Sequence, residues 1–300
     1  MLNYISAKLF DLKGTAQTYI DETNIILFTA DHDVVTNDKS LLDVPITYKK
    51  INYIFNKKSC ESNPKIETIN LGTKSNLKNI KDLVHASLGT KTENISHQPA
   101  MSKEQLAKAI NLGRQTAQKT KLNGSKIFVA REISDANIIY ATAIAVALLD
   151  INIEELPFLD NSNKHMISQA ITTHKKHLTS AIEIVHHLGS FEIAALTGSF
   201  LCCAHMGLPI LVDGYVSTVA ALIVSKICPT ATPWFLFSQP PSNIIHSTIY
   251  QRLNAKPLLQ NSGRFEGISG ITSALSLIQL AYTSHNEITH YKTTSLYKVN

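Results

Sequence analysis

The sequence has no apolar run that is long and unbroken enough to cross a membrane as a helix. Its most apolar passage, residues 190–227, is interrupted by Glu192, Gly207 and Pro209, and the last part, residues 216–227, is too short to span a bilayer. The opening residues, MLNYISAKLFDLKG, lack the apolar core of a secretory signal. We therefore expect a globular, cytoplasmic protein with no membrane association.

The sequence also has few cysteines and only a small excess of positive charge. The four cysteines, Cys60, Cys202, Cys203 and Cys228, include no Cys-x-x-Cys pair, so we interpret them as reduced residues of a cytosolic protein. The net charge is +5, but the lysines are scattered and form no long basic block. This charge pattern is only weak evidence for a nucleic-acid partner. It fits a solvated surface or a small anionic substrate equally well.

Several motifs that would identify a site directly are missing. No Gly-Lys-Ser/Thr phosphate loop, Gly-x-Gly-x-x-Gly fingerprint or Gly-x-Ser-x-Gly elbow occurs. His174 and His177 are three residues apart and His186 and His187 are adjacent, but no His-Glu-x-x-His pattern is present. We expect most of these histidines to lie on the surface, and no metal or cofactor.

What the chain does contain is an alternation of strand and helix patterns. With 300 residues and 44% apolar residues, it can bury a large core. Expected strands are residues 25–30, 66–71, 126–130, 210–212 and 233–238. Expected helices are residues 2–20, 46–55, 102–119, 137–149, 165–187 and 190–204, one from about residue 216, one that carries His246 and one that ends near Tyr282. This order predicts an α/β fold, a doubly wound parallel sheet with helices on both faces.

Local signals support several of these boundaries. Ser102 followed by Gln105 is a capping-box pattern at the start of a helix. Residues 210–212 are all apolar and are bounded by turn residues, which favours a strand buried on both faces. The tail after Asn286 is rich in Thr, Tyr and Lys and is interpreted either as an edge strand or as a disordered segment.

Polar residues follow three of the expected strands and precede the last expected helix. Asp31 and His32 follow one strand, Glu132 and Asp213 follow two others, and Glu266 precedes the last helix among glycines. All carboxyl ends of a parallel sheet lie on one edge, so these side chains are expected to converge into a site. Two alternatives stay open: Asp213 as a helix cap, and the Glu-Gly-Ile-Ser-Gly segment as a simple turn instead of a phosphate cradle.

Five passages together resemble one family, the nicotinate-nucleotide:dimethylbenzimidazole phosphoribosyltransferases of cobalamin lower-ligand synthesis. They are GSFEIAALTGSF (189–200), GLPILVDGYVSTVAAL (207–222), ADHDVV (30–35), PAMS (99–102) and LNAKPLLQNSGRFEGISG (253–270). They occur in the family's order along most of the chain. The resemblance implies a doubly wound domain, here residues 20–285, with residues 1–19 and 286–300 in or near a small helical subdomain.

The resemblance also implies a reaction. The phosphoribosyl group of nicotinate mononucleotide would pass to a benzimidazole-like base, which gives an α-riboside 5'-phosphate and nicotinate, without a metal or other cofactor. The expected ligands are the two small-molecule substrates, with no nucleic acid and no membrane. The expected protein partner is a second copy of the chain, since the family is usually homodimeric, or a paralogue. A carboxylate would take the proton of the attacking nitrogen.

Site residues follow from the resemblance residue by residue. Glu132 and Glu266 are the candidate catalytic proton acceptors. Candidate substrate-binding residues are Asp213 and Asn137 on the ribose side, Ser269 and Gly270 at the phosphate, Asp31, His32 and Met101 around the base, and His187, Gly189, Ser190 and Gly267.

Departures from the family pattern motivate a second hypothesis. The family's glycine-rich Gly-Glu-Met-Gly-Ile-Gly-Asn loop reads Arg131-Glu132-Ile133-Ser134-Asp135-Ala136-Asn137, which replaces three glycines and adds a carboxylate. The family's catalytic glutamate position falls on Gly267, with Glu266 one residue early. The alternative to an enzyme is therefore a catalytically silent family member that acts as a structural or regulatory subunit, in a heterodimer with an active paralogue. A third alternative is an unrelated small-ligand binder on the same scaffold.

Overall fold

The described part of the chain forms one parallel sheet. The computed structural model describes residues 1–13, 23–33, 65–73, 83–134, 136–260 and 269–296. The strands are β1 (Asn24–Ala30), β2 (Lys65–Gly72), β3 (Leu83–His85), β4 (Phe128–Glu132), β5 (Ile210–Val212) and β6 (Phe235–Phe237). They pair in parallel in the order β3-β2-β1-β4-β5-β6, so the order along the chain reverses between β1 and β4.

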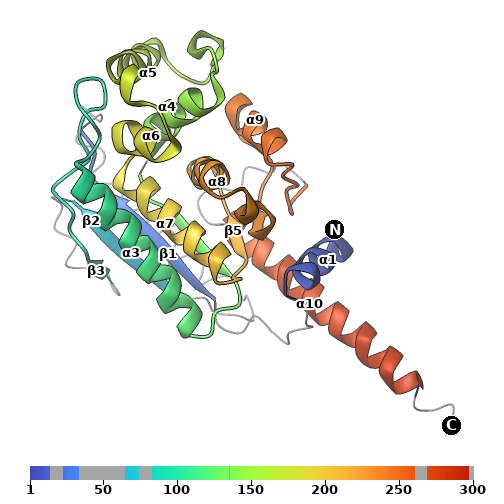
Figure 1. Cartoon of the computed structure of the whole chain (residues 1–300). Helices are drawn as coiled ribbons and strands as arrows, with labels where there is room; N and C mark the ends of the chain where they lie inside the picture. Colours follow the sequence, from blue (N-terminus) through green and yellow to red (C-terminus); the bar gives the residue numbers. More distant parts are fainter. Residues whose placement is uncertain (14–22, 34–64, 74–82, 135, 261–268, 297–300) are drawn as a thin grey trace.

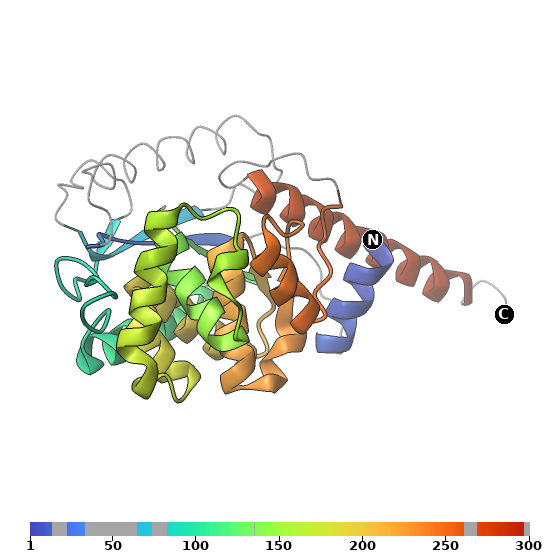
Figure 2. The same cartoon turned by 90° about the horizontal axis from the view of Figure 1, so that it is seen from above.

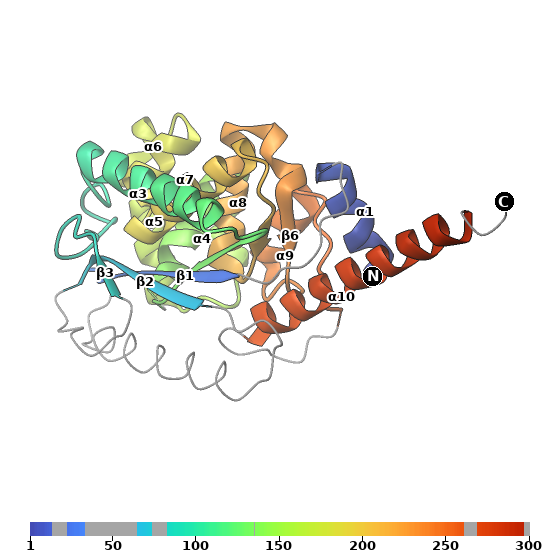
Figure 3. The same cartoon turned by 90° about the horizontal axis from the view of Figure 1, so that it is seen from below.

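Helices cover both faces of this sheet, which confirms the predicted fold class. They are α1 (Leu2–Lys13), α3 (Lys103–Leu122), α4 (Asn137–Leu149), α5 (Asn161–His174), α6 (Ala181–Leu188), α7 (Phe191–His205), α8 (Tyr215–Ile227), α9 (Ile244–Arg252) and α10 (Ser269–Leu296). Single 3₁₀ turns are η1 (Ile153–Glu155), η2 (Lys175–His177) and η3 (Pro229–Trp234). Helices α3 to α9 pack in one cluster with the sheet, and α10 packs on the opposite face with α1 beside it (Figure 1, Figure 3).

The alternation of side chains along β1 separates the two layers. Ile26 and Phe28 belong to the larger core with α3 to α9, whereas Ile25 and Leu27 belong to the core with α1 and α10. All four are at most 1% exposed. Because successive side chains of a strand point to opposite faces, an uninterrupted apolar strand of this kind requires cover on both sides.

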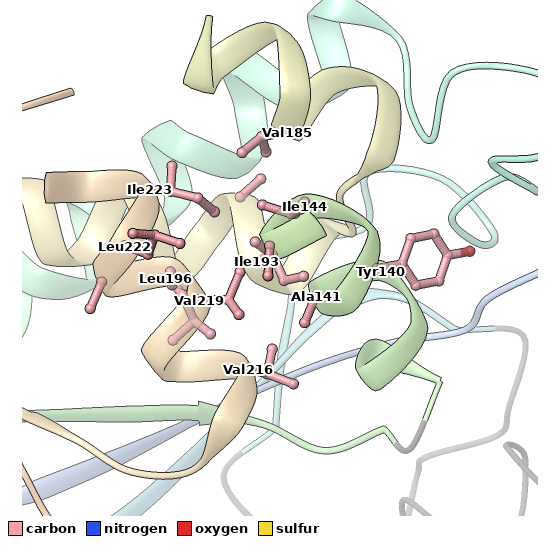
Figure 4. Packing of buried hydrophobic residues seen from close by; sticks show 14 of the residues in the cluster. Tyr140, Ala141, Ile144, Val185, Ile193, Leu196, Val216, Val219, Leu222 and Ile223 are labelled. Atoms are coloured by element: carbon pink, nitrogen blue, oxygen red, sulfur yellow. The ribbon is translucent and has the colours of Figure 1, made fainter. Parts of the chain in front are cut away.

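The larger core is formed mainly by aliphatic side chains from α4, α7 and α8. Figure 4 shows Ile144, Leu196 and Val219 pointing toward one another from these three helices. Tyr140 lies at the edge of this cluster, and its hydroxyl donates a hydrogen bond to the carbonyl oxygen of Glu93 at 3.0 Å. The three helices therefore share one continuous core.

Helices α3 and α7 approach closely because both carry glycine at their crossing. A Cβ on Gly113 would lie 1.9 Å from the carbonyl oxygen of Ala195, and one on Gly198 would lie 2.1 Å from that of Ile110. The capping box predicted at Ser102 and Gln105 is present at the start of α3. The glycine contact fixes how α7 lies on the sheet, and with it the first turn of α7, where the site begins.

Three expected elements differ from the structure. The helix expected over residues 165–187 is divided into α5, η2 and α6, because Ser180 is extended and its side chain caps a new helix by accepting a hydrogen bond from the backbone of Glu183. The last helix does not end near Tyr282, and the tail is neither strand nor disordered up to Leu296, because no Gly or Pro interrupts residues 271–296. The short edge strand β3 was not predicted.

Other boundaries shift by a few residues. Strand β4 begins at Phe128 instead of Lys126, and β6 begins at Phe235, because Pro233 lies in the 3₁₀ turn before it. Helix α1 is described to Lys13, and the rest of the expected helix 2–20 and the expected helix 46–55 lie outside the described residues.

Helix α1 lies beside α10 at the side of the molecule where both chain ends are found (Figure 2). The hydroxyl of Ser6 donates to the carbonyl oxygen of Ala281 at 3.1 Å, and Lys8 Nζ donates to that of Phe235 at 2.5 Å. The division into residues 20–285 and a terminal subdomain stays a prediction. Within the described residues, no helix combines the length and apolarity needed to span a bilayer.

Candidate functional site

The candidate site lies where the strand order reverses, at the carboxyl ends of β1 and β4. His32 follows β1, and Glu132 is the last residue of β4, where it pairs with Phe28 of β1. In open α/β sheets, ligands bind in the crevice at this reversal, because the loops after the two central strands diverge to opposite sides. The strand-end residues that the sequence predicted to converge should therefore meet around these two strands.

Glu192 is at the centre of the first group of polar side chains. It lies in the first turn of α7 and is completely buried. Its Oε1 accepts hydrogen bonds from the backbone N–H of Ala30 at 3.0 Å and from Asn137 Nδ2 at 3.0 Å, and it lies 3.1 Å from His32 Nε2. One carboxylate oxygen thus connects the end of β1 with the starts of α4 and α7.

The start of α7 extends this network to Ser190. Ser190 is the N-cap of α7, and its Oγ accepts from the backbone N–H of Ile193 at 3.2 Å. The same hydroxyl donates to Asn137 Oδ1 at 2.5 Å. Of the predicted substrate-binding residues, His32, Asn137 and Ser190 are therefore brought together, with Glu192 joining them.

The electrostatics of this group keep Glu192 ionised. Burial by itself would raise the pKa of Glu192, but the charge of His32 and hydrogen bonds from His32 and Asn137 outweigh it and hold the pKa below its ordinary value. Glu192 Oε2 and His32 Nδ1 are buried and have no hydrogen-bond partner among the described residues. Since a buried polar atom without a partner costs free energy, these two atoms are candidates for contact with a polar ligand.

Asp213 is at the centre of a second group, at the ends of β5 and β6. Its Oδ1 accepts from Gln239 Nε2 at 2.8 Å and from the hydroxyl of Ser238, and its Oδ2 accepts from Arg131 Nη1 at 3.2 Å. Asp213 is only 1% exposed. The group therefore holds a buried carboxylate whose charge is balanced by the Arg131 guanidinium.

The interpretation of Asp213 as a helix cap is wrong. The N-cap of α8 is Gly214, and no side chain makes a capping hydrogen bond there. Gly214 has φ +83°, a conformation that favours glycine, and it turns the chain so that Asp213 faces β6 instead of the helix.

Glu132 lies between the two groups and interacts electrostatically with Glu192 and Asp213. Burial raises its pKa to about 7, the two nearby carboxylates add to this effect, and Arg131 opposes it. Its Oε2 has no hydrogen-bond partner among the described residues. A carboxyl group with a pKa near neutrality can both accept and release a proton, which is what general acid–base catalysis requires.

Ser269 and Gly270 start α10 next to the Asp213 group. A Cβ on Gly270 would lie 2.0 Å from Gln239 Nε2, and this amide is bonded to Asp213. The absence of a side chain at Gly270 thus lets the start of α10 approach the end of β6. Glu266 and Gly267 lie outside the described residues, so the position of Glu266 stays a prediction.

Asp31 and Gly189 directly precede His32 and Ser190 in the chain, and Met101 precedes the N-cap of α3. Asp31 is buried, and its backbone N–H donates to Gly72 at 2.9 Å. Met101 is buried just before α3, and its neighbour Ala100 donates a backbone hydrogen bond to His187 at 3.1 Å. Gly189 ends α6 in an extended conformation, where a Cβ would lie 2.5 Å from the carbonyl oxygen of Val185.

The expectation that most of the clustered histidines lie on the surface is wrong. His174, His186 and His187 are at most 7% exposed, and only His177 of the four is exposed. They are buried because the break before α6 folds this helix back against α5 and α4.

Sequence reasoning missed Glu192, Ser238 and Gln239 as members of the site. The signal for Glu192 was available, since it is the single charged residue in the first turn of an otherwise apolar helix behind the N-cap Ser190. Ser238 and Gln239 gave no such signal, because only the pairing of β5 with β6 places them beside Asp213.

The strand order, with its reversal between β1 and β4, and the helices on both faces define a doubly wound α/β protein. Comparison with known proteins goes further. A family model described as phosphoribosyltransferase matches residues 1–295. Two curated relatives, from Pseudomonas fluorescens and Ectopseudomonas mendocina, are each 30% identical over 301 residues, which cover 96% of this chain and 86% of the relative. Both are named nicotinate-nucleotide–dimethylbenzimidazole phosphoribosyltransferase.

The chain belongs to the nicotinate-nucleotide:dimethylbenzimidazole phosphoribosyltransferase family. A crystal structure of the protein of that name from Thermus thermophilus superposes with a TM-score of 0.78 at 21% identity and covers 94% of this chain and 88% of its own. This likeness confirms the fold, and the resemblance drawn from the sequence motifs is confirmed by the family match.

Proposed function

We propose that the protein transfers the phosphoribosyl group of nicotinate mononucleotide to dimethylbenzimidazole or a similar flat base, in the synthesis of the cobamide nucleotide loop. The observation that carries this proposal is the match to relatives of that name along almost the whole chain. The polar groups at the ends of β1, β4 and β5 support it, because they supply acids and a guanidinium at the crevice where such folds bind nucleotides.

In this reaction a ring nitrogen of the base forms a bond to C1' of the ribose. The bond from C1' to the nicotinate nitrogen breaks, and nicotinate leaves with the electron pair. The base attacks through its unprotonated ring nitrogen, and the proton on its other ring nitrogen passes to a carboxylate. Glu132 is suited to accept this proton because burial raises the pKa of Glu132 to about 7. Glu266 is the second candidate for this role.

Binding roles are assigned as part of the proposal. Asn137 and Asp213 contact the ribose, and the start of α10 at Ser269 and Gly270 holds the phosphate, since helix N-termini favour anions. The base lies near His32, whose Nδ1 has no partner among the described residues. Asp31, Met101, His187, Gly189, Ser190 and Gly267 complete the binding site in this proposal.

The test is an assay of the purified full chain with nicotinate mononucleotide and dimethylbenzimidazole. We expect nicotinate and the α-riboside phosphate to appear in equal amounts by chromatography and mass spectrometry. Absence of both products, together with no heat of nicotinate mononucleotide binding by calorimetry, would overturn the proposal. Heat only after addition of an active paralogue would instead support the silent-subunit hypothesis, which the departures at residues 131–137 motivate and the comparisons do not favour.

Variants separate the two candidate bases. Glu132→Gln and Glu266→Gln are each assayed beside Glu104→Gln, which changes an exposed glutamate of α3. Loss of a general base lowers kcat by about 10²–10⁴-fold, so the variant of the true base should fall by that factor while the control keeps its rate. A variant with full activity is removed from the catalytic assignment.

We further propose that the protein acts in the cytoplasm as a homodimer, or as a heterodimer with a paralogue. Free thiols at Cys202, Cys203 and Cys228 support the first part, since they match a reducing compartment. Light scattering of the purified chain tests the second part. A monomeric mass at concentrations where the assay shows activity contradicts the dimer.

A further inference from the structure

A group of potential metal ligands lies on α6, outside the polar groups at the strand ends. Glu183, His186 and His187 occupy positions i, i+3 and i+4 of this helix, which places them on one face. Each offers one ligand atom, and these atoms lie within 4.8 Å of one another. The sequence expectation of no metal site rested on the absence of a His-Glu-x-x-His pattern, whereas the structure places the carboxylate one turn before the two histidines.

The distances within this group are too long for good hydrogen bonds but suit a shared ion. Glu183 Oε2 lies 3.5 Å from His186 Nδ1 and 3.8 Å from His187 Nε2. Hydrogen bonds between such atoms are normally about 2.7–3.2 Å long. Ligands about 2.0–2.2 Å from a tetrahedral zinc ion are roughly 3.4 Å apart, which is close to the first of these distances.

The hydrogen bonds behind His187 leave its Nε2 without a proton. His174 Nε2 lies 2.9 Å from the carbonyl oxygen of Ile95, which can only accept, so His174 carries its proton on Nε2. His174 Nδ1 then accepts from His187 Nδ1 at 3.0 Å, and His187 Nε2 is left with a lone pair that faces Glu183.

His186 supplies an independent observation. Its Nδ1 is buried and has no hydrogen-bond partner among the described residues, although it faces the same carboxylate oxygen. His187 Nε2 and His186 Nδ1 therefore both face Glu183 Oε2 without a good hydrogen bond. A cation bound between these three atoms would stabilise them. The exposed Lys103 does not supply it, since its Nζ is 3.9 Å from the other oxygen, Oε1.

We propose that Glu183, His186 and His187 bind a divalent transition-metal ion of the zinc class, with a fourth position open to solvent. Two imidazoles and a carboxylate are a ligand set that such ions accept. Metal-binding histidines usually donate a hydrogen bond from their second ring nitrogen. His187 does so to His174, which in turn donates to the carbonyl oxygen of Ile95. The carboxylate of Glu183 is one-third exposed, so an ion can enter from solvent. This proposal shares His187 with the binding site proposed above, but its test measures metal binding, so its outcome does not depend on the transferase activity.

The test uses the full chain without a histidine tag, freed of metal by a chelator and titrated with Co²⁺. We expect one equivalent to bind with the visible absorption of a tetrahedral cobalt site. A thiolate charge-transfer band would instead place the ion on cysteine and overturn the assignment. Absence of any cobalt absorption would overturn it as well.

Variants locate the ion. Glu183→Gln and His186→Ala should each weaken Co²⁺ binding by at least about tenfold, because even outer-shell partners of metal ligands contribute that much. His165→Ala changes an exposed histidine of α5 and should bind like the wild type. Glu183→Gln keeps the size of a partly exposed side chain, so it decides the question if His186→Ala does not fold. Wild-type affinity in a folded Glu183→Gln protein refutes the proposal.

Discussion

At the scale of single residues, the site contains two buried carboxyl groups whose pKa values are shifted in opposite directions by their neighbours. Glu192 has a lowered pKa because His32 and Asn137 compensate its burial, whereas Glu132 has a raised pKa because its compensation by Arg131 is weaker. The two acids therefore differ in protonation near neutral pH although both are buried. This difference in pKa suits Glu192 to a positioning role and Glu132 to proton exchange.

The raised pKa of Glu132 makes stability depend on pH. Its carboxyl binds a proton more tightly in the folded state, at about 7, than at its ordinary value of 4.5, so its contribution is complete below pH 4.5 and is lost as pH rises through 7. Relative to Glu132→Gln, the wild type should lose about 3 kcal/mol of unfolding free energy between pH 4.5 and 8. Urea unfolding of both proteins across this range measures the difference, and a constant difference would contradict the raised pKa.

Glu192 is expected to be the more costly residue to remove. Glu192→Ala leaves the N–H of Ala30 and the Asn137 amide without their acceptor and should lower the free energy of unfolding by about 3–5 kcal/mol. Glu192→Gln keeps one acceptor oxygen and should cost less. Denaturant unfolding compares both with Glu154→Ala, an exposed control expected to change by less than about 0.5 kcal/mol. Equal stability of Glu192→Ala and the control would contradict the central place of this carboxylate.

At the scale of elements, the crossing of α3 and α7 positions the first turn of α7 and thus Glu192. Gly198→Ala should lower the free energy of unfolding by about 1–3 kcal/mol, as overpacking does. Alanine favours a helix by about 1 kcal/mol over glycine, but a Cβ 2.1 Å from the carbonyl oxygen of Ile110 forces the backbones apart. Thermal unfolding checks this against Gln115→Ala, an exposed change on α3. A more stable Gly198→Ala protein would show that the helices can separate without cost.

The prediction of elements from the sequence succeeded where a local signal was sufficient. The apolar strand β5, the capping box of α3 and the alanine-rich α4 were predicted within two or three residues. The division between α5 and α6 was missed because residues 165–187 have no proline or glycine, and the break depends on Ser180 capping a helix that packs against α4. The sequence named His32, Asn137 and Ser190, which the structure brings into contact with Glu192, and Asp213, which lies in the second group, but it overlooked Glu192 itself. Their roles in binding stay a prediction.

At the scale of the whole molecule, the sheet contributes side chains to two separate cores, and no described helix belongs to both. Ile5 of α1 is fully buried in the smaller core, whereas the sole tryptophan, Trp234, packs against the larger one. Ile5→Ala should lower the free energy of unfolding by about 2–5 kcal/mol. If both layers unfold together, Trp234 fluorescence and circular dichroism will shift to the same lower temperature. Ala7→Ser, on the exposed side of α1, serves as the control, and a Trp234 transition unmoved by Ile5→Ala would favour a separate terminal subdomain.

The sequence by itself determined the class of the fold and the family, because both are encoded in local patterns: apolar strands, helix caps and five motifs in a fixed order. Which side chains meet was decided by the tertiary structure alone. Asp213 meets Gln239 only through the pairing of β5 with β6, and Glu192 meets His32 only because α7 packs with its first turn at the end of β1. Contacts between distant segments depend on strand order and helix crossing, which no single stretch of sequence specifies.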